Sequence, residues 1–232
     1  MNLLRNIKES VLHLFFPHVC EGCGTDIIGT ETLLCLRCVA SLPATHFERY
    51  PHNPVEKIFW GRLPVMDAVA QYYFSKESLV QHLLHQLKYK QNKEIGWQLG
   101  RMMGHAMKAS GRFRADALLP LPLFTARERK RGYNQAAIIC EGISEVTGLP
   151  VWKDIINRPE HTETQTKKGR VERWKNIDGK FALVHPEKLE GKHVILVDDV
   201  ITTGATLESC GQEILKAKDC CLSIAALAYA SK

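Results

Sequence analysis

Two adjacent carboxylates and a short loop behind them form the part of the chain best suited to chemistry. Asp198 and Asp199 end a run of apolar residues that begins at Val194. The loop that follows is small and hydroxylated: Thr202, Thr203, Gly204, Ala205 and Thr206. Where such a loop opens a helix, backbone N–H groups and the helix dipole favour an anion, and threonine hydroxyls add donors. The stretch therefore predicts a cradle for a phosphate group.

The two carboxylates beside this cradle need a partner other than the phosphate, because like charges repel. They are suited to accept hydrogen bonds from the vicinal hydroxyls of a ribose whose 5′-phosphate occupies the loop. The stretch has neither a Walker A sequence nor a Gly-x-Gly-x-x-Gly pattern, so the usual nucleotide-binding motifs do not apply. The alternative is an exposed acidic turn before a capped helix, which accounts for Asp199 or Thr202 singly but not for the whole set.

Four cysteines form a second pattern with clear chemistry. Cys20 and Cys23 make one Cys-x-x-Cys pair, and Cys35 and Cys38 make another after eleven intervening residues. Two such turns supply four thiolates in a tetrahedral arrangement, which is typical of structural zinc. Paired disulfides or redox dithiols are the alternative, and the ligands alone do not distinguish zinc from iron. The pattern predicts a small zinc module.

The other four cysteines have no companion at ligand spacing. Cys140, Cys210, Cys220 and Cys221 all lie among apolar residues. A reactive thiol needs a basic and exposed setting, whereas unpaired cysteine is often buried. We expect these four side chains to pack in the core.

Apolar strands alternating with helices must position these groups. The expected strands cover 67–74, 116–120, 192–198 and 221–230, with further strands near 151–156 and 180–184. The expected helices cover 78–90 and 94–109, then begin near Asn134 and near Thr206, and a basic loop covers 127–131. This order predicts an α/β fold with a parallel sheet covered on both faces. Ligands of such sheets bind beyond the carboxyl ends of the strands, where Asp198 and Asp199 lie.

Composition limits the class of protein. Of the 232 residues, 45% are hydrophobic, which is typical of a globular protein. The net charge of +6 favours an anionic partner and does not choose between a nucleic acid and a phosphorylated small molecule. Residues 3–15 show the spacing of a short amphipathic helix, and a proline-rich linker leads to a boundary near residue 60. We expect a zinc module with its flanking segments over 1–60 and one larger domain over 61–232. The sequence contains neither a signal peptide nor a 20-residue apolar span, so we expect a cytoplasmic protein without membrane insertion.

The stretch VILVDDVITTGAT, residues 194–206, closely resembles the phosphoribosyl pyrophosphate signature of type I phosphoribosyltransferases. Three further segments and the four-cysteine module extend the resemblance over nearly the whole chain: LKYK at 87–90, LPLP at 119–122 and RERKRGYNQA at 127–136. Together they resemble the competence protein F (ComF/ComFC) family. The resemblance implies a type I phosphoribosyltransferase fold with an N-terminal zinc-ribbon module.

The resemblance also assigns roles to matching positions. Asp198 and Asp199 would be the catalytic carboxylates at the ribose hydroxyls, and residues 202–206 would bind the 5′-phosphate. Pro120 and Leu121 would belong to the loop that holds pyrophosphate. Further cations would face the pyrophosphate and its Mg²⁺-bridged oxygens: Lys88, Lys90, Arg127 and Arg131. The alternatives are a solvated helix end for the two lysines and a DNA-contacting loop for the two arginines.

The segment 158–176 fits the mobile loop that closes over such a site. Five of its residues resemble the loop pattern of the family: Thr162, Gln165, Arg170, Arg173 and Asn176. A lid of this kind excludes water from the reacting groups.

Two functions follow from the resemblance. In the first, the protein transfers a phosphoribosyl group from phosphoribosyl pyrophosphate, or binds a related ribose phosphate, during DNA uptake by natural transformation; the acceptor stays open, and so does catalysis itself. In the second, the fold is a non-catalytic scaffold that binds single-stranded DNA through basic segments at 127–131 and 167–175. Tyr133 and Trp174 would then be stacking platforms. A DNA-uptake helicase or processing protein is the expected partner.

Overall fold

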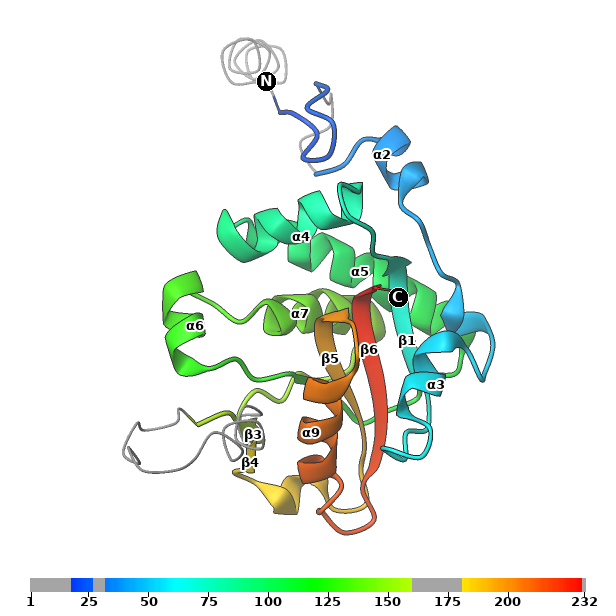
Figure 1. The fold of residues 1–232 in the computed structure, drawn as a ribbon, viewed down its shortest axis with the longest axis vertical. Coiled ribbons are helices and arrows are strands. Elements are labelled where there is room, and N and C mark those ends of the chain that lie inside the picture. Colours follow the sequence, from blue (N-terminus) through cyan, green and yellow to red (C-terminus); the bar gives the residue numbers. More distant parts are fainter. Residues whose placement is uncertain (1–17, 27–31, 160–180, 231–232) are drawn as a thin grey trace, which may run out of the picture.

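A four-stranded parallel sheet forms the centre of the molecule. The computed structural model describes residues 18–26, 32–159 and 181–230 (Figure 1). The strands are β1 (Ala68–Tyr73), β2 (Ala117–Pro120), β5 (His193–Ile201) and β6 (Cys221–Tyr229). Their order across the sheet is β1-β6-β5-β2, and each neighbouring pair is parallel. The parallel-sheet fold expected from the sequence is confirmed.

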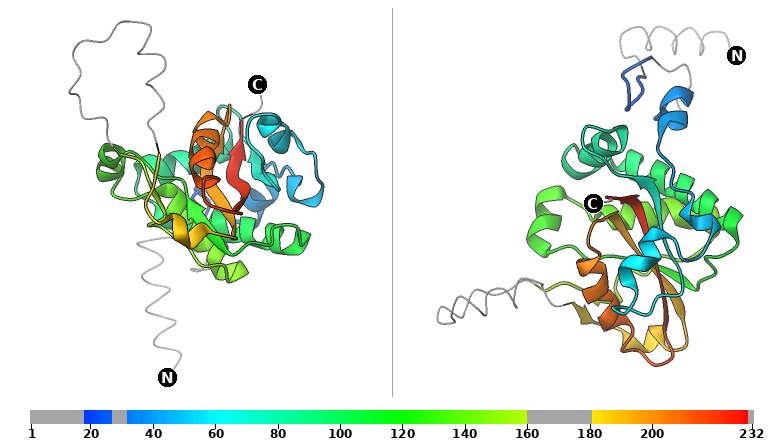
Figure 2. Two further views of the ribbon diagram at one scale, coloured as in Figure 1. Left: turned by 90° about the horizontal axis from the view of Figure 1, so that it is seen from below. Right: turned by 45° about the vertical axis from the view of Figure 1, so that its right-hand side comes forward.

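The central strands are apolar because helices cover both of their faces. Val194 to Val197 of β5 are fully buried, as are Ile224 to Ala226 of β6. Helices α5 (Lys93–Ser110) and α7 (Gln135–Thr147) lie on one face, and α9 (Ala205–Ile214) lies on the other together with α3 (Pro54–Phe59) (Figures 1 and 2). Continuous apolar runs are typical of strands buried in this way.

Helices α5 and α7 pack unusually closely because glycines face each other. A Cβ atom on Gly100 would lie 2.4 Å from the Ile139 carbonyl oxygen, and one on Gly142 would lie 2.1 Å from that of Trp97. Both distances are far below van der Waals contact. The contact between the helices therefore requires glycine at both positions.

The remaining elements are short. Helices α4 (Leu79–Tyr89) and α6 (Thr125–Arg131) lie near the carboxyl ends of the strands, and α2 (Leu36–Ser41) begins directly after Cys35 and contains Cys38 (Figure 1). Two 3₁₀ helices, η1 (Phe47–Arg49) and η2 (Pro186–Leu189), lie in connections. Strands β3 (Ile156–Asn157) and β4 (Ala182–Leu183) form a separate antiparallel pair.

Two local predictions were wrong. Residues 127–131, expected as a loop, belong to helix α6, which ends at Gly132 in the left-handed conformation with a φ of 80°. Its basic last turn favours a helix C-terminus. The strand expected over 151–156 is reduced to a single bridge from Val151 to Leu118 and the two residues of β3. The other expected strands and helices are confirmed to within a few residues, as far as they lie within the described ranges.

The four-cysteine segment lies against helix α4 (Figure 1). The carbonyl oxygen of Glu21 is 3.1 Å from His82 Nε2 and accepts a hydrogen bond of 2.9 Å from Gln86 Nε2. A Cβ on Gly22 would lie 3.0 Å from Leu79 Cδ1, so the knuckle touches α4 directly. Between this segment and the sheet, Ala44 bridges to Tyr72 at the outer edge of β1. The division into residues 1–60 and 61–232 remains a prediction.

Within the described residues, no helix combines the length and the apolar character that a membrane crossing requires. The amphipathic helix expected over 3–15 lies outside the described residues.

Candidate functional site

The two carboxylates lie near the carboxyl end of β5. Successive side chains of a strand point to opposite faces. Asp198 accordingly lines a small cavity of about 40 Å³ with the loop that leads into α9, whereas Asp199 turns toward helix α4. The loop itself contributes residues 202–206 to the cavity. The structure therefore places one of the two carboxylates, Asp198, beside the predicted phosphate cradle.

Asp199 is held by a lysine from helix α4. Lys88 Nζ lies 2.9 Å from both carboxylate oxygens, and both side chains are largely buried, with 22% and 14% of their surface exposed. Lys88 is in the last turn of α4, where a cation is favoured by the helix dipole. Because the pair is shielded from water, its attraction is less screened than that of a surface ion pair.

Asp198 has an altered acidity. Burial, together with the charge of neighbouring Asp199, raises the pKa of the Asp198 carboxyl to about 7. Its carboxylate accepts a 2.7 Å hydrogen bond from the Asp199 backbone N–H, which opposes the rise together with the charges of Lys88 and Arg158. Asp198 therefore changes its charge near neutral pH, where it can either accept or donate a hydrogen bond.

The predicted phosphate loop opens helix α9. Gly204 occupies the N-cap position with a φ of 73°, in the left-handed region that only glycine enters at little cost. Thr203 Oγ1 accepts a hydrogen bond of 3.4 Å from the Ala205 N–H. The first N–H groups of α9 have no partner within the helix, which makes this terminus suited to an anion.

Arg158 is a site residue that the sequence did not single out. Its guanidinium carbon lies 3.8 Å from the ring centroid of Phe124 and 4.9 Å from that of Phe181. Its positive charge acts on the Asp198 carboxyl. The only signal in the sequence is its position at the start of the expected lid, because the two aromatic rings come from distant segments.

The segment expected to hold pyrophosphate borders a second cavity. Pro120 and Pro122 line this cavity of about 270 Å³ together with Asn134, Lys153 and Arg158. The side chain of Leu121 is buried, and its N–H donates to the Val197 carbonyl of β5. The backbone N–H of Leu121 is therefore bonded within the sheet. Pro120 and Pro122 line the cavity, whereas the Leu121 side chain does not.

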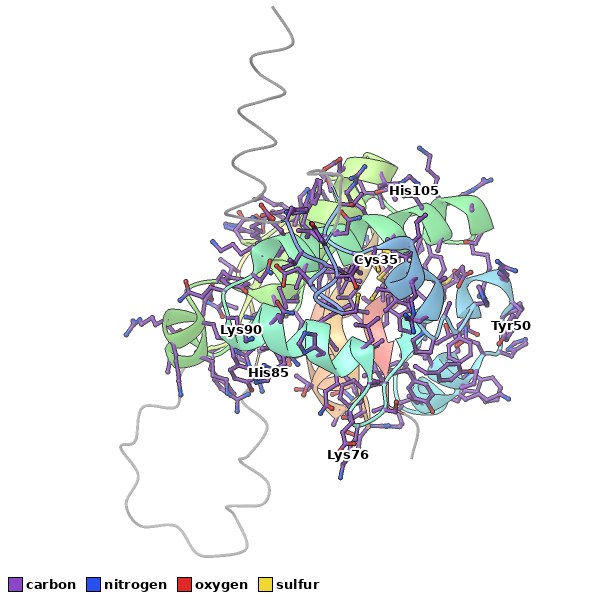
Figure 3. All side chains as sticks on the ribbon, turned by 90° about the horizontal axis from the view of Figure 1, so that it is seen from above. Cys35, Tyr50, Lys76, His85, Lys90 and His105 are labelled. Atoms are coloured by element: carbon purple, nitrogen blue, oxygen red, sulfur yellow. The ribbon has the colours of Figure 1, made fainter. Side chains whose placement is uncertain are left out.

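A third cavity is strongly basic. It has a volume of about 450 Å³ and lies between the end of α4 and helix α6, lined by Lys88, Tyr89, Gln91, Arg127, Lys130 and Arg131. The Arg131 guanidinium lies 5.7 Å from the Tyr89 ring centroid. Lys90, also expected here, is an exposed cap residue on the same side of the molecule (Figure 3). The structure thus brings three of the four predicted cations around one basic pocket, and Lys88 also reaches Asp199.

Tyr133 does not form the stacking surface expected of it. Only 8% of its surface is exposed, and its hydroxyl donates a short hydrogen bond to the Leu87 carbonyl of α4. The ring is therefore a packing element between α4 and the start of α7. Exposed Tyr89 is the aromatic residue beside the cations instead. Trp174 and the lid residues from Thr162 to Asn176 lie outside the described residues.

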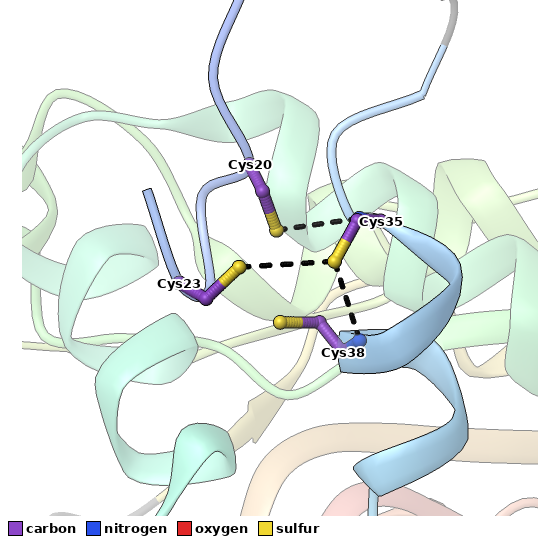
Figure 4. Close-up of side chains that lie close together, drawn as sticks. All are labelled: Cys20, Cys23, Cys35 and Cys38. Carbon is purple, nitrogen blue, oxygen red and sulfur yellow. Dashed lines mark hydrogen bonds between the residues drawn. The ribbon is translucent and has the colours of Figure 1, made fainter. Parts of the chain in front are cut away.

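The four cysteines near the N-terminus converge on one point (Figure 4). Their sulfur atoms all lie within 4.8 Å of one another, and Cys23 Sγ is 3.7 Å from Cys35 Sγ. A zinc–sulfur bond of ~2.3 Å gives a tetrahedral edge of about 3.8 Å, so this donor set fits zinc. A Cβ on Gly22 would lie 2.8 Å from Cys38 Sγ, which shows that glycine leaves room for the cluster.

Backbone N–H groups within the cluster favour the thiolate of Cys20. The Cys35 N–H lies 3.2 Å from Cys20 Sγ, and the Gly22 N–H lies 3.4 Å from the same sulfur. The hydrogen bond with Thr25 lowers the pKa of Cys23 to about 6, whereas burial raises that of Cys38. Thiolates are the metal-binding form of cysteine, so these contacts suit a metal site.

The other four cysteines divide into two groups. Cys140 and Cys210 are fully buried, as expected, and burial raises the pKa of both thiols. Cys220 is half-buried and Cys221 is exposed, so the expectation of core packing was wrong for Cys221. Cys221 begins strand β6 at the rim of the sheet, where its side chain lies outside the core.

Similarity to known proteins covers most of the chain. The phosphoribosyl transferase domain family matches residues 146–232. The DNA utilization protein YhgH of Shigella flexneri is 30% identical over 207 residues, which cover 85% of this chain and 84% of that protein. Competence protein F of Haemophilus influenzae is 27% identical over 211 residues, which cover 88% and 87%.

Among solved structures, adenine phosphoribosyltransferase from Leishmania donovani matches with a TM-score of 0.38 and 14% identity, covering 78% of this chain and 81% of that one. Similarity at this level carries no functional inference.

Proposed function

Because the chain belongs to the competence protein F family of phosphoribosyltransferase-like proteins, we propose that it binds phosphoribosyl pyrophosphate at the carboxyl end of β5. The ligand class is that of a ribose 5-phosphate with a pyrophosphate group on C1 of the sugar. The relatives named above show the family, and the proposed ligand is inferred from the residues of this chain.

One observation carries the proposal. Asp198 and the loop 202–206 line one cavity at the N-terminus of α9. A carboxylate and an anion-binding helix terminus on one cavity suit a ligand that has hydroxyl groups and a phosphate at a fixed separation. A ribose 5-phosphate has both, since its hydroxyls lie on the ring opposite the 5′-carbon. The loop would bind the phosphate, and Asp198 would bind the hydroxyls together with Asp199.

Basic residues near the site would neutralise the negative charge of the pyrophosphate group. Lys88 contacts Asp199 and also lines the basic pocket with Arg127 and Arg131. Arg158, beside the Pro120–Pro122 segment, adds another cation near Asp198. Pyrophosphate gains negative charge as it leaves the sugar, so cations here would stabilise that charge. Mg²⁺, when bound, would neutralise pyrophosphate oxygens and be held largely by the ligand itself. Whether a transfer occurs depends on an acceptor that these residues do not specify.

We further propose that Cys20, Cys23, Cys35 and Cys38 bind one structural zinc ion. The spacing of their sulfur atoms and the N–H groups directed at Cys20 support this assignment. Since the knuckle contacts α4 through Glu21 and Gly22, the ion would stabilise the segment that rests on this helix.

A second function, the binding of single-stranded DNA, is supported by helix α6. Its exposed residues Arg127, Arg129 and Lys130 carry three positive charges on seven residues, and Tyr89 stands beside them with 63% of its surface exposed. A site for single-stranded DNA combines two parts: positive side chains along the path of the phosphate backbone, and an aromatic ring on which a base stacks. The phosphoribosyl site and this surface share Lys88, so the two ligands would compete for this residue.

The cellular role that fits both sites is DNA uptake by natural transformation, in the cytoplasm, alongside a helicase or processing protein. Calorimetric titration of phosphoribosyl pyrophosphate with Mg²⁺ into the wild-type protein and into variants of Asp198 and Asp199 tests the proposed ligand.

A further inference from the structure

Arg62 links the phosphate loop to a distant part of the chain. It lies in the turn after α3, and its Nη1 donates to the Thr203 carbonyl oxygen at 3.0 Å and to the Ile58 carbonyl oxygen at 3.2 Å. Its Nη2 forms an ion pair with Glu208 in the first turn of α9. One guanidinium therefore joins α3, the loop and α9.

The contact with Thr203 fixes the direction of a peptide group. In a trans peptide the C=O of one residue and the N–H of the next point in opposite directions. Described residues contain no cis peptide, so the Gly204 N–H points away from Arg62 when the Thr203 carbonyl points toward it. Thr203 and Gly204 both line the small cavity that also contains Asp198. Arg62 thus holds the N–H of Gly204, a residue that lines the cavity, in a direction away from its own guanidinium.

Helix α3 packs directly against Gly204. A Cβ on Gly204 would lie 2.8 Å from Ile58 Cγ2 and 3.0 Å from the Phe59 ring. Two turns further along α9 the packing is similar, because a Cβ on Gly211 would lie 2.6 Å from Leu63 Cδ2. The segment from Ile58 to Leu63 therefore serves as a support against which the loop is shaped.

We propose that Arg62 is a positioning residue for the phosphate end of the site, which orients the Gly204 N–H toward a phosphomonoester. This inference rests on the proposed function, because it takes residues 202–206 as the phosphate loop. Arg62 itself contacts backbone and Glu208, so its effect reaches the ligand through the loop. The arginine fork is needed because one planar group must reach two carbonyls and a carboxylate together.

The test compares Arg62→Ala with Glu208→Gln, which keeps Arg62 and its two carbonyl contacts but removes the charge of its partner. Arg62 is partly exposed, with 39% of its side chain accessible, so the ion pair adds little to stability and both variants should melt close to the wild type. In calorimetry, Arg62→Ala should bind ribose 5-phosphate at least about tenfold more weakly. This is the loss expected when the Gly204 N–H no longer donates its hydrogen bond to the charged phosphate. Glu208→Gln should bind like the wild type. A role in stability alone would weaken both variants in proportion to their loss of melting temperature.

A ligand-free measurement separates this inference from the proposed function. In amide NMR spectra, Arg62→Ala should shift the Gly204 resonance and speed its hydrogen exchange, whereas Glu208→Gln should leave both close to wild type. If the wild-type protein binds no ribose 5-phosphate, the proposed function fails, while the Gly204 amide still decides whether Arg62 orients the loop. An unchanged Gly204 amide in Arg62→Ala, or ribose 5-phosphate binding that is unaffected by it, overturns the inference.

Discussion

Lys88 Nζ lies 2.9 Å from each carboxylate oxygen of Asp199, although the two residues are 111 positions apart in the chain. The contact joins the end of α4 to the end of β5, where the proposed ligand binds. Asp199 is thereby charge-compensated, whereas Asp198, directly before it, titrates near neutral pH. The two neighbouring carboxylates therefore have different electrostatic roles.

This shielded ion pair should contribute measurably to stability. We expect a double-mutant cycle with Lys88→Met and Asp199→Asn to give a coupling free energy of about 1 kcal/mol or more, measured by denaturant unfolding. The matched control is the pair Lys153–Glu141, whose side chains are 55% and 42% exposed. That cycle should give only about 0.2–0.5 kcal/mol. Equal coupling in the two cycles would show that shielding does not strengthen the Lys88–Asp199 contact.

Much of this site follows from local sequence, and its supports do not. The apolar run before Asp198 and the small residues after Ile201 predict a strand, a loop and a helix because each pattern is local. Arg62 and Thr203 are separated by 141 positions, so their contact exists only in the folded chain. Arg158 depends in the same way on Phe124 and Phe181. The sequence predicts a loop at α6 because the charged composition of this segment hides the helical pattern. It predicts a buried Cys221 because local apolarity does not reveal the rim of a sheet.

The pKa of Asp198 predicts a stability profile with a definite sign. Between about pH 4 and pH 7 the folded protein retains the Asp198 proton that the unfolded chain releases, so this group lowers stability as the pH rises through that window and no further above it. Asp198→Asn keeps an acceptor for the Asp199 N–H and removes the penalty. We expect the variant to be more stable than the wild type by about 1–2 kcal/mol at pH 8, and by progressively less toward pH 4.

Asp116 provides a control of opposite sign. The hydrogen bond from the His193 N–H and the nearby Lys192 lower the pKa of Asp116, so its contribution is present at neutral pH and is lost as the pH falls. Asp116→Asn should therefore lose stability at pH 7 and approach the wild type in acid. Thermal unfolding from pH 2 to pH 8 measures both profiles, because the contribution of Asp116 is lost only below about pH 4. A stability difference for Asp198→Asn that does not vary with pH would contradict the assignment.

The four-cysteine cluster should contain metal in the native protein. Elemental analysis should find about one zinc ion per chain, and Cys20→Ser should lose it because three thiolates hold zinc less tightly than four. The main domain should still unfold cooperatively, since the four-stranded sheet and its covering helices form most of the buried core, to which Cys20 and Cys38 also belong. The control is Cys221→Ser, whose exposed thiol lies away from the cluster and should leave the zinc content unchanged. Native protein without zinc or iron would refute the metal site, whereas iron alone would change only the identity of the ion.

Helix α6 should determine any binding of single-stranded DNA. We expect weak, sequence-independent binding that falls steeply with salt, and reversal of Arg127, Arg129 and Arg131 to Glu should abolish most of it and lower the salt slope by roughly 2. Reversal of Lys192, Lys216 and Lys218, near the other end of the sheet, makes the same change in net charge. Fluorescence anisotropy at several salt concentrations should show that this control retains more affinity. If both triple variants lose affinity equally, net charge and not the α6 surface is responsible.

The most direct test of the central claim is calorimetric titration of phosphoribosyl pyrophosphate with Mg²⁺ into four proteins. The wild type should bind, and Asp198→Asn with Asp199→Asn should bind at least about 100-fold more weakly, since two charged acceptors of ~1.5–3 kcal/mol each are lost. Thr203→Val should weaken binding through the phosphate end instead, with ribose 5-phosphate affected in parallel. Asp199→Asn also removes the Lys88 ion pair, so the melting temperature of the double variant is measured beside the titration. The single variant Asp198→Asn, which should not be destabilised at pH 8, should already bind more weakly than the wild type. Equal affinity of the wild type and the double variant, or no binding by the wild type, would contradict the account and leave the stretch as a capped helix after an acidic turn.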